Sequence, residues 1–255
     1  MTPIRQPTPT HPSMRARAVP LEGAFNFRDA GGHRAGVRTV RSGLVYRSDG
    51  LHRLTPADLA RIRRLGIRTV IDLRSTEECA RFGVCDVRRL PATYHHVPLV
   101  EKPWPHPADG ESASTWLSHR YLDLIEASGD GIVSVLATVA DAAAWPVVFH
   151  CTGGKDRTGV VAAVLLGLLG VDDDDIVLDY CRSTLGITWL RQSLEGSGSS
   201  ADHIDLPAAL FEVPAQAMRQ VLQRVAATHG SMERWALDAG MPPAVISALR
   251  AGLLT

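Results

Sequence analysis

The sequence predicts an α/β fold in which helices flank a parallel β-sheet, because short apolar segments alternate with segments of helical spacing. Residues 146–150 are apolar and rich in β-branched and aromatic side chains, which is typical of a buried central strand. Residues 159–169 follow and are apolar on nearly every side, which indicates a buried helix. Ligands of parallel sheets bind at the carboxyl ends of the strands, so the loop between these two segments is the first candidate site.

An earlier helix and strand are also predicted. Thr55 and Pro56 supply a helix cap and a first-turn proline, apolar residues then recur at helical spacing, and Gly66 ends the helix. Residues 67–73 are predicted to form the strand that follows. This order, helix then strand, agrees with a parallel sheet joined by crossovers.

The rest of the chain is predicted to be mainly helical. A second strand is expected around residues 95–100, and helices are expected at 116–125 and 132–143. Beyond Asp172 the pattern is wholly helical. A Gly/Ser-rich stretch at 196–200 interrupts it and could act as a hinge.

Composition bounds the domain organisation and the partners. Residues 1–20 contain few large apolar side chains, so a disordered tail is predicted there, followed by a single domain over residues 21–255. Lys and Arg number 27, as do Asp and Glu, so the net charge does not indicate a nucleic-acid or membrane-surface protein. Any anion binding must therefore be local.

The four cysteines, at positions 79, 85, 151 and 181, include no C-x-x-C pair. This predicts reduced thiols rather than a disulfide framework or a zinc site, with a regulatory Cys79–Cys85 disulfide left open. The longest apolar stretch, residues 159–171, is too short to cross a bilayer, and the N-terminus lacks the order of a signal peptide. A cytoplasmic protein is expected, and export without a signal peptide stays open.

The loop after residue 150 carries the strongest functional signal. Gly153 and Gly154 allow backbone N–H groups to turn inward around an anion, and the N-terminus of the next helix adds positive potential. Arg157 can bind phosphate oxygens bidentately, and the same surroundings stabilise a Cys151 thiolate to which Thr158 could donate its hydroxyl. The residues expected to bind phosphate are Thr152, Gly153, Gly154, Lys155, Asp156, Arg157 and Thr158.

A family resemblance covers roughly residues 20–255. Residues 150–159 read H-C-T-G-G-K-D-R-T-G. Other segments agree in order and spacing: Asn26-Phe27-Arg28-Asp29 with Gly31-Gly32, Tyr46-Arg47-Ser48, Ile71-Asp72-Leu73-Arg74-Ser75 with Glu78, Asp179-Tyr180 with Ser183, Gly230-Ser231 and Leu237-Asp238-Ala239-Gly240. Together they resemble the bacterial atypical tyrosine, dual-specificity and lipid phosphatases related to the mycobacterial secreted tyrosine phosphatase.

The resemblance implies a tyrosine-phosphatase-like fold with a four-stranded parallel sheet and a helical lid, placed at residues 186–230. It implies hydrolysis of phosphotyrosine, and of phosphoserine, phosphothreonine or phosphoinositides, with Cys151 as the nucleophile that forms a phosphocysteine and Arg157 as the phosphate clamp. No metal or cofactor is expected. The partners would be phosphorylated proteins or phosphoinositides, with no nucleic acid and no stable membrane insertion.

The general acid is predicted less directly. Ordinary tyrosine phosphatases carry it on a Trp-Pro-Asp loop, and here Trp104-Pro105 is followed by a histidine. Asp156, inside the phosphate loop, is the first candidate for the acid, Asp72 at the end of a strand is the second, and Asp109 is a distant third. Asp156 could instead only cap or pair.

Three further expectations have plain structural alternatives. Asp72 could form an ion pair that orients Arg157 or Arg74. Lys155 could bind an additional phosphate on an inositol ring, or be a solvated lysine at the rim. The residues expected to support the pocket rather than to touch substrate are His150, Asn26, Arg28 and Asp29.

Apolar residues recur at helical spacing between residues 206 and 225. Core packing explains them, whereas the resemblance implies a mobile lid that shields the thiolate. Two other functions also stay open. One is a non-catalytic phosphate or phosphoinositide-binding module, and the other is sulfur transfer or arsenate reduction, which for arsenate needs a resolving thiol such as Cys181.

Overall fold

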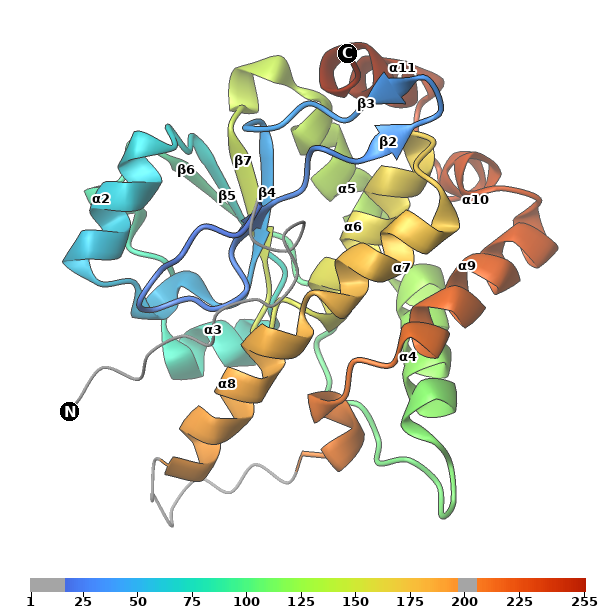
Figure 1. Ribbon diagram of the computed structural model, residues 1–255, viewed down its shortest axis with the longest axis horizontal. Coiled ribbons are helices and arrows are strands. Elements are labelled where there is room, and N and C mark those ends of the chain that lie inside the picture. Colours follow the sequence, from blue (N-terminus) through green and yellow to red (C-terminus); the bar gives the residue numbers. More distant parts are fainter. Residues whose placement is uncertain (1–16, 197–205) are drawn as a thin grey trace.

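The computed structural model describes residues 17–196 and 206–255, and its centre is a five-stranded sheet with the order β1-β4-β7-β5-β6 (Figure 1). The strands are β1 (Arg28–Asp29), β4 (Val45–Ser48), β7 (Val147–His150), β5 (Thr69–Asp72) and β6 (Thr93–His96). Four of them are parallel, and β1 pairs antiparallel with β4 at the edge. The predicted α/β class and the four parallel strands are confirmed, and the antiparallel edge strand is an addition.

The register brings three strand ends together. His150 of β7 pairs with Ser48 of β4 on one side and with Asp72 of β5 on the other. Because the strands are parallel, the residues that follow these positions leave the sheet at the same edge. The loop that begins with Cys151 therefore lies between the ends of β4 and β5.

Helices cover both faces of the sheet (Figure 1). On one face, Val70 and Val148 pack with Leu59 and Ile62 of α2 (Pro56–Arg64). Ile71 and Phe149 point to the other face and join the larger core. The helices that contribute to that core are α4 (Ala113–Ala127), α5 (Gly129–Ala140), α6 (Asp156–Leu168), α7 (Asp173–Cys181), α9 (Ala215–His229), α10 (Met232–Asp238) and α11 (Pro243–Leu253).

Local sequence explains where the first helices begin. The side chain of Thr55 accepts a hydrogen bond from the N–H of Asp58, and the carboxylate of Asp58 accepts one from the N–H of Thr55. Pro56 is the first helical residue of α2. This confirms the predicted helix start. Ser75 and Glu78 form the same capping box at the start of α3 (Thr76–Phe82).

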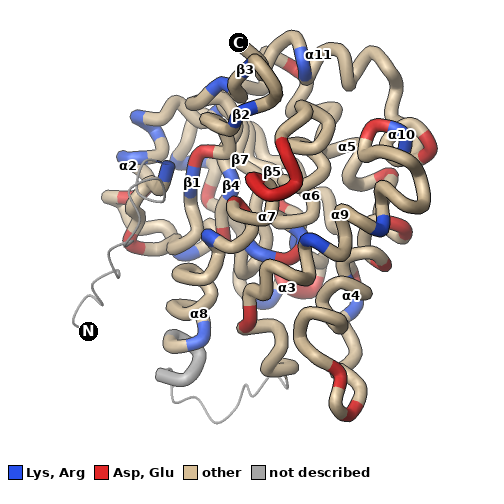
Figure 2. Tube along the Cα trace, turned by 45° about the vertical axis from the view of Figure 1, so that its right-hand side comes forward, with Lys and Arg blue, Asp and Glu red and all other residues tan. Residues whose placement is uncertain are grey.

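Beyond Asp172 the described elements are all helices, as predicted, and they are joined by short non-helical segments such as residues 212–214. The acidic run before Ile176 begins α7, and Figure 2 shows it as the red segment beside that helix's label. α8 (Thr184–Gly196) and η4 (Ala208–Phe211) flank residues 197–205, so most of the predicted hinge at 196–200 lies outside the described residues.

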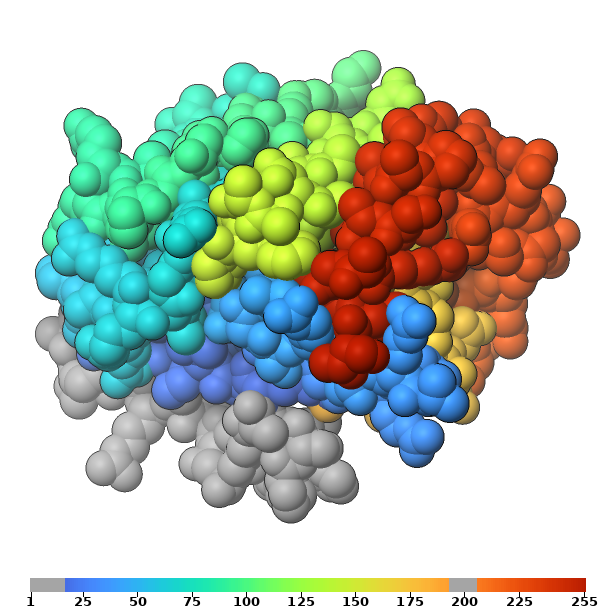
Figure 3. Space-filling model, turned by 90° about the horizontal axis from the view of Figure 1, so that it is seen from above, coloured from blue at the N-terminus to red at the C-terminus, as the bar shows by residue number. Residues whose placement is uncertain are grey.

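The C-terminus returns to the N-terminal half of the chain. Leu254 forms a bridge with Val40, and the N–H of Arg41 donates to the carbonyl of Leu253. Figure 3 shows the red C-terminal end against the blue residues around the hairpin of β2 (Arg34–Ala35) and β3 (Arg38–Thr39). The two halves of the chain are thus joined at the end of the sheet where β4 begins, which is opposite the end that carries the loop.

The predicted tail falls partly within the described residues. Residues 1–16 lie outside them. Ala18 forms a bridge with Arg28, and the N–H of Val19 donates to the carbonyl of Phe27 at 3.1 Å. Residues 17–19, which belong to the predicted tail, therefore pair with the chain around the edge strand β1.

No helix among residues 17–196 and 206–255 is both long and apolar enough to cross a membrane. Cys79, Cys85, Cys151 and Cys181 are all free thiols in the structure.

Candidate active site: a cysteine loop between β7 and α6

Cys151 follows the last residue of β7 and is 1% exposed. Residues 151–155 form a tight loop that leads into α6, whose first residue is Asp156. The strand and the helix are both buried, so they fix the two ends of the loop. The predicted strand–loop–helix unit is therefore present, although α6 begins three residues earlier than expected.

Gly154 is required by the path of the loop. Its φ angle is +65°, and an added Cβ would lie 2.6 Å from the backbone nitrogen of Asp49 and 2.7 Å from the carbonyl carbon of Ser48. A left-handed conformation is strained for other residues, and backbone atoms of the neighbouring strand end cannot give way. Gly154 thus allows the loop to pass directly over the end of β4.

The carbonyl groups of the loop are held from outside. Asn26 donates from Nδ2 to the carbonyls of Gly153 and Gly154 at 3.1 and 3.0 Å, and Nη2 of Arg47 donates to that of Gly154 at 2.9 Å. In a planar trans peptide the next N–H points the opposite way. The N–H groups of Gly154 and Lys155 therefore point away from Asn26 and Arg47, which is the arrangement expected of an anion-binding nest.

A buried ion cluster supports these contacts from behind. Asp179 lies 2.6 Å from Nη1 of Arg47 and 3.3 Å from Nε of Arg28, which also donates from Nη2 to the hydroxyl of Ser183. Burial and the charge of Arg28 lower the pKa of Arg47 to about 10. Burial alone would raise the pKa of Asp179, but the two arginines hold it well below its usual range. Arg28 therefore contacts the ion cluster behind the loop, and its supporting role stays a prediction.

Arg157 is oriented by a carboxylate of the neighbouring helix α3. Its Nη2 donates to Oε1 of Glu78 at 2.8 Å, and Nη1 contacts Oε2. Glu78 also accepts from the hydroxyl of Thr152 and from the N–H of Ser75. Burial would raise the pKa of Glu78, but its bonds to Arg157 and Thr152 lower it to about 2. Helix α3 therefore fixes both an arginine and a threonine of the loop.

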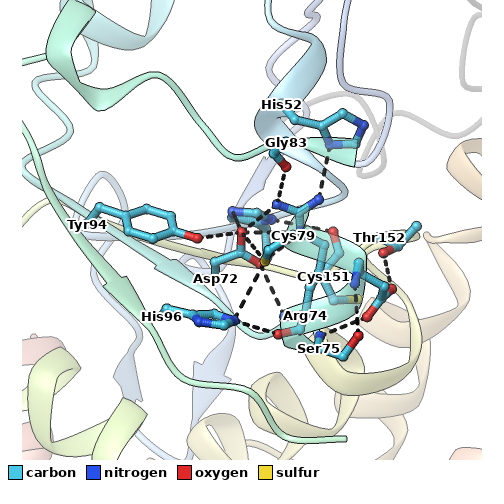
Figure 4. Close-up of polar contacts among 12 residues, drawn as sticks. His52, Asp72, Arg74, Ser75, Cys79, Gly83, Tyr94, His96, Cys151 and Thr152 are labelled. Atoms are coloured by element: carbon cyan, nitrogen blue, oxygen red, sulfur yellow. Dashed lines mark hydrogen bonds and ion pairs between the residues drawn. The ribbon is translucent and has the colours of Figure 1, made fainter. Parts of the chain in front are cut away.

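Asp72 is committed to a different arginine. Its Oδ2 lies 2.6 Å from Nη2 of Arg74 and its Oδ1 2.9 Å from Nε, and Tyr94 donates to Oδ2 at 2.9 Å (Figure 4). The carboxylate is fully buried. Burial would raise its pKa, but His150 and Arg74 hold the pKa well below its usual range. The geometry is that of the ion pair weighed as the alternative for Asp72, with Arg74 as the partner.

Asp156 lies at the start of α6 beside two donors. Tyr121 of α4 donates its hydroxyl to Oδ1 at 2.7 Å, and Nζ of Lys155 is 3.2 Å from the same oxygen. The side chain remains 18% exposed. Of the two main candidates, Asp156 is the one with a carboxylate at the loop and partly open to solvent.

Lys155 differs from both of its predicted roles. It is fully buried, and its Nζ donates to the carbonyls of Leu210 and Glu212 at 2.9 and 2.7 Å. It is neither solvated at a rim nor free to meet an additional phosphate, because its three donors already have acceptors in Leu210, Glu212 and Asp156. Lys155 instead joins the loop to the segment around η4.

Three other predicted residues lie away from the expected contacts. The hydroxyl of Thr158 is buried and has no hydrogen-bond partner among the described residues, so the expected bond to the Cys151 sulfur is not present. Asp29 accepts from the N–H groups of Gly31 and Gly43, each at 2.7 Å, and supports that turn rather than the loop. Asp109 is exposed between β6 and α4.

Helix α8 lies over the loop. An added Cβ on Gly153 would be 3.0 Å from Cδ1 of Ile187, and one on Gly186 would be 2.9 Å from Cβ of Asn26. In Figure 1 α8 lies at the lower end of the sheet, where β7 and β5 finish. α8 therefore fits the predicted cover, whereas Ala217, Val221 and Val225 of α9 are buried in the main core, which is the packing alternative.

Comparisons with known proteins decide the family. A family model described as the tyrosine phosphatase family matches residues 19–255. This chain is a member of that family. The triple specificity protein phosphatase PtpB of Mycobacterium tuberculosis is 30% identical over 273 residues, which cover 92% of this chain and 98% of the relative. A tyrosine-protein phosphatase of Nostoc commune is 32% identical over 75% of this chain and 58% of its own length.

Solved structures that resemble this phosphatase are less similar in sequence. The catalytic core of Siw14 is 14% identical and matches with a TM-score of 0.41, covering 75% of this chain and 88% of its own. TpbA of P. aeruginosa is 19% identical with a TM-score of 0.39, covering 82% and 97%.

Sequence reasoning gave no role to four residues of the phosphatase site. Arg47, Glu78 and Asp179 were part of the family resemblance, and Tyr121 was only a core residue of a predicted helix. A signal existed for Glu78, since Ser75-x-x-Glu78 is a capping box that places α3 beside the strand ends. No pattern in the sequence links Tyr121 to Asp156, because their contact joins residues 35 positions apart.

No group of three or more His, Cys, Asp or Glu residues in the described parts could hold a metal ion.

Proposed function

We propose that this phosphatase hydrolyses phosphate monoesters in two steps through Cys151. In the first step the sulfur bonds to phosphorus while the ester P–O bond breaks, and Asp156 gives a proton to the leaving oxygen. In the second step Asp156 takes a proton from a water molecule, whose oxygen attacks the phosphocysteine. Inorganic phosphate leaves, and the thiolate is regenerated.

One arrangement carries this proposal. Cys151 lies under a loop whose carbonyls are held outward by Asn26 and Arg47, so that N–H groups face inward, and Arg157 is fixed beside it by Glu78. Inward amides and a guanidinium stabilise the charge that spreads over the phosphoryl oxygens in the transition state. The same groups favour the thiolate form of the nucleophile.

The substrate range proposed is phosphotyrosine together with phosphoserine, phosphothreonine and phosphoinositides. The family resemblance supports it, as does a relative named a triple specificity protein phosphatase. Parallel kcat/KM values on a phosphotyrosine peptide, a phosphoserine peptide and mono-phosphorylated phosphoinositides would test it. Turnover of the phosphotyrosine peptide alone would restrict the proposal to tyrosine.

Cys151→Ser tests the nucleophile. We expect turnover of an aryl phosphate to fall by roughly 10³-fold or more while phosphate still binds, because a serine hydroxyl is not activated in this setting. Cys181→Ser, at a thiol outside the loop, is the matched control and should keep parental turnover. Undiminished activity of Cys151→Ser would end the proposal.

Asp156→Asn tests the acid. We expect it to slow esters with poor leaving groups far more than esters with good ones, since only a poor leaving group needs the proton. Asp72→Asn should lose stability without changing this dependence, because it removes the buried partner of Arg74. The opposite pattern would move the acid to Asp72.

A phosphate-binding module without catalysis is the second candidate, because Cys151 is almost fully buried beneath α8. Alkylation discriminates between the two. If iodoacetamide modifies Cys151 no faster than Cys79 or Cys181 near neutral pH, the binding module is favoured.

Since the nucleophile must stay reduced, we also propose a cytoplasmic location, which thiol labelling in cells would check.

A further inference from the structure

The carboxylate proposed as the acid is held at Oδ1. Both Tyr121 and Lys155 contact Oδ1 of Asp156, at 2.7 and 3.2 Å. Neither of these two contacts uses Oδ2. With two donors on Oδ1, the oxygen left to carry a transferable proton is Oδ2.

The hydroxyl that holds Oδ1 is itself fixed. Tyr121 is fully buried in α4, and its oxygen lies 2.9 Å from the hydroxyl of Tyr180 in α7. The two rings meet edge to face with centroids 6.0 Å apart, and the ring of Trp104 also packs against Tyr121 with centroids 6.1 Å apart. A buried ring packed against two other rings keeps one rotamer, so its hydroxyl can set the direction of the carboxylate.

We propose that Tyr121 is a positioning residue for proton transfer, which turns Oδ2 of Asp156 toward the leaving oxygen. This rests on the proposed function, because it assigns Asp156 the proton transfer. Tyr121 does not touch substrate. Its hydroxyl acts through Oδ1, and Tyr180 holds that hydroxyl in turn.

The test compares Tyr121→Phe with Tyr94→Phe on two aryl phosphates, one with a good leaving group such as 4-nitrophenol and one with a poor one such as phenol. Tyr121→Phe keeps the ring and removes the shorter of the two contacts to Oδ1 of Asp156. We expect kcat on phenyl phosphate to fall roughly 10- to 100-fold, with KM unchanged and less than about threefold loss on the nitrophenyl ester. Tyr94→Phe removes a matched hydroxyl from the carboxylate of Asp72, which is not the proposed acid, and should change both rates by less than about threefold.

The outcomes are distinguishable. A loss in Tyr121→Phe that is equal on both esters, or the same selective loss in Tyr94→Phe, would overturn the positioning role while the phosphatase itself still works. If the parent protein hydrolyses neither ester, the proposed function fails first. Thermal unfolding midpoints of both variants within a few degrees of the parent would show that the rates report on folded protein.

Discussion

At the scale of single residues, Glu78 of α3 contacts two residues of the phosphate-binding segment. It contacts both terminal nitrogens of Arg157, accepts from Thr152 and caps its own helix. An arginine that is already aligned loses less side-chain freedom when it binds a phosphate. Glu78 therefore prepares the clamp before substrate arrives.

Glu78→Gln should separate this orienting role from simple capping. Glutamine keeps one oxygen acceptor but loses the charge and one of the two contacts to Arg157. We expect kcat/KM on an aryl phosphate to fall roughly tenfold, the cost of a misaligned bidentate clamp. Glu77→Gln, one position earlier in the same helix turn, is the control and should stay near the parental value. Equal behaviour of the two variants would show that Glu78 only caps α3.

Local sequence patterns predicted where residues lie when their placement depends on chain neighbours, and missed contacts between residues far apart in the chain. Cys151, Gly154 and Arg157 were predictable because a strand end, a left-handed glycine and a helix start are local features. Lys155 was misassigned because its acceptors, Leu210 and Glu212, are more than 50 positions away. The sequence shows that Lys155 carries hydrogen-bond donors, but only the fold shows which carbonyls accept from them.

At the scale of elements, α8 lies over the loop that holds the thiol. Ile187 is 2% exposed and lies above Gly153. The same helix stacks Trp189 on Phe25 and also contacts η4. Its extent was not predictable, because apolar spacing is the same in a cover and in a core helix such as α9. What separates them is the surface each contacts: α9 packs on α4 and α7, and α8 packs on the loop.

Ile187→Ala should uncover Cys151. Removing the branched side chain leaves open space above Gly153 while alanine preserves the helix. We expect iodoacetamide to alkylate Cys151 several-fold faster, together with a stability loss of about 2–4 kcal/mol for the lost packing. Thr188→Ala, on the exposed side of the next position, should leave the alkylation rate unchanged. If Ile187→Ala does not change the rate either, α8 does not limit access.

At the scale of the whole molecule, folding keeps several ionisable groups in one protonation state. Burial lowers the pKa of His33, His52 and His150 to about 4 each, so they are neutral near pH 7. Glu78, Asp72 and Asp179 are held ionised by arginine partners. In both sets the pKa is lower in the folded state than in the unfolded state, so both contribute stability that is lost as the pH falls.

Stability should therefore decline in two stages on acidification. Between about pH 6.5 and 4 the unfolded chain binds protons at the histidines that the folded protein excludes, so at pH 5 His33 and His150 should each cost about 2 kcal/mol, and the less buried His52 somewhat less. The carboxylates add a second loss below about pH 4, which continues to about pH 2 for Glu78. Urea unfolding at pH 7.5, 6, 5 and 4 would measure this, with His119→Gln as a control at an exposed histidine. An unfolding free energy that does not change from pH 7 to pH 5 would mean that these imidazoles are hydrated in the folded protein. It would contradict the burial of His150 next to Cys151.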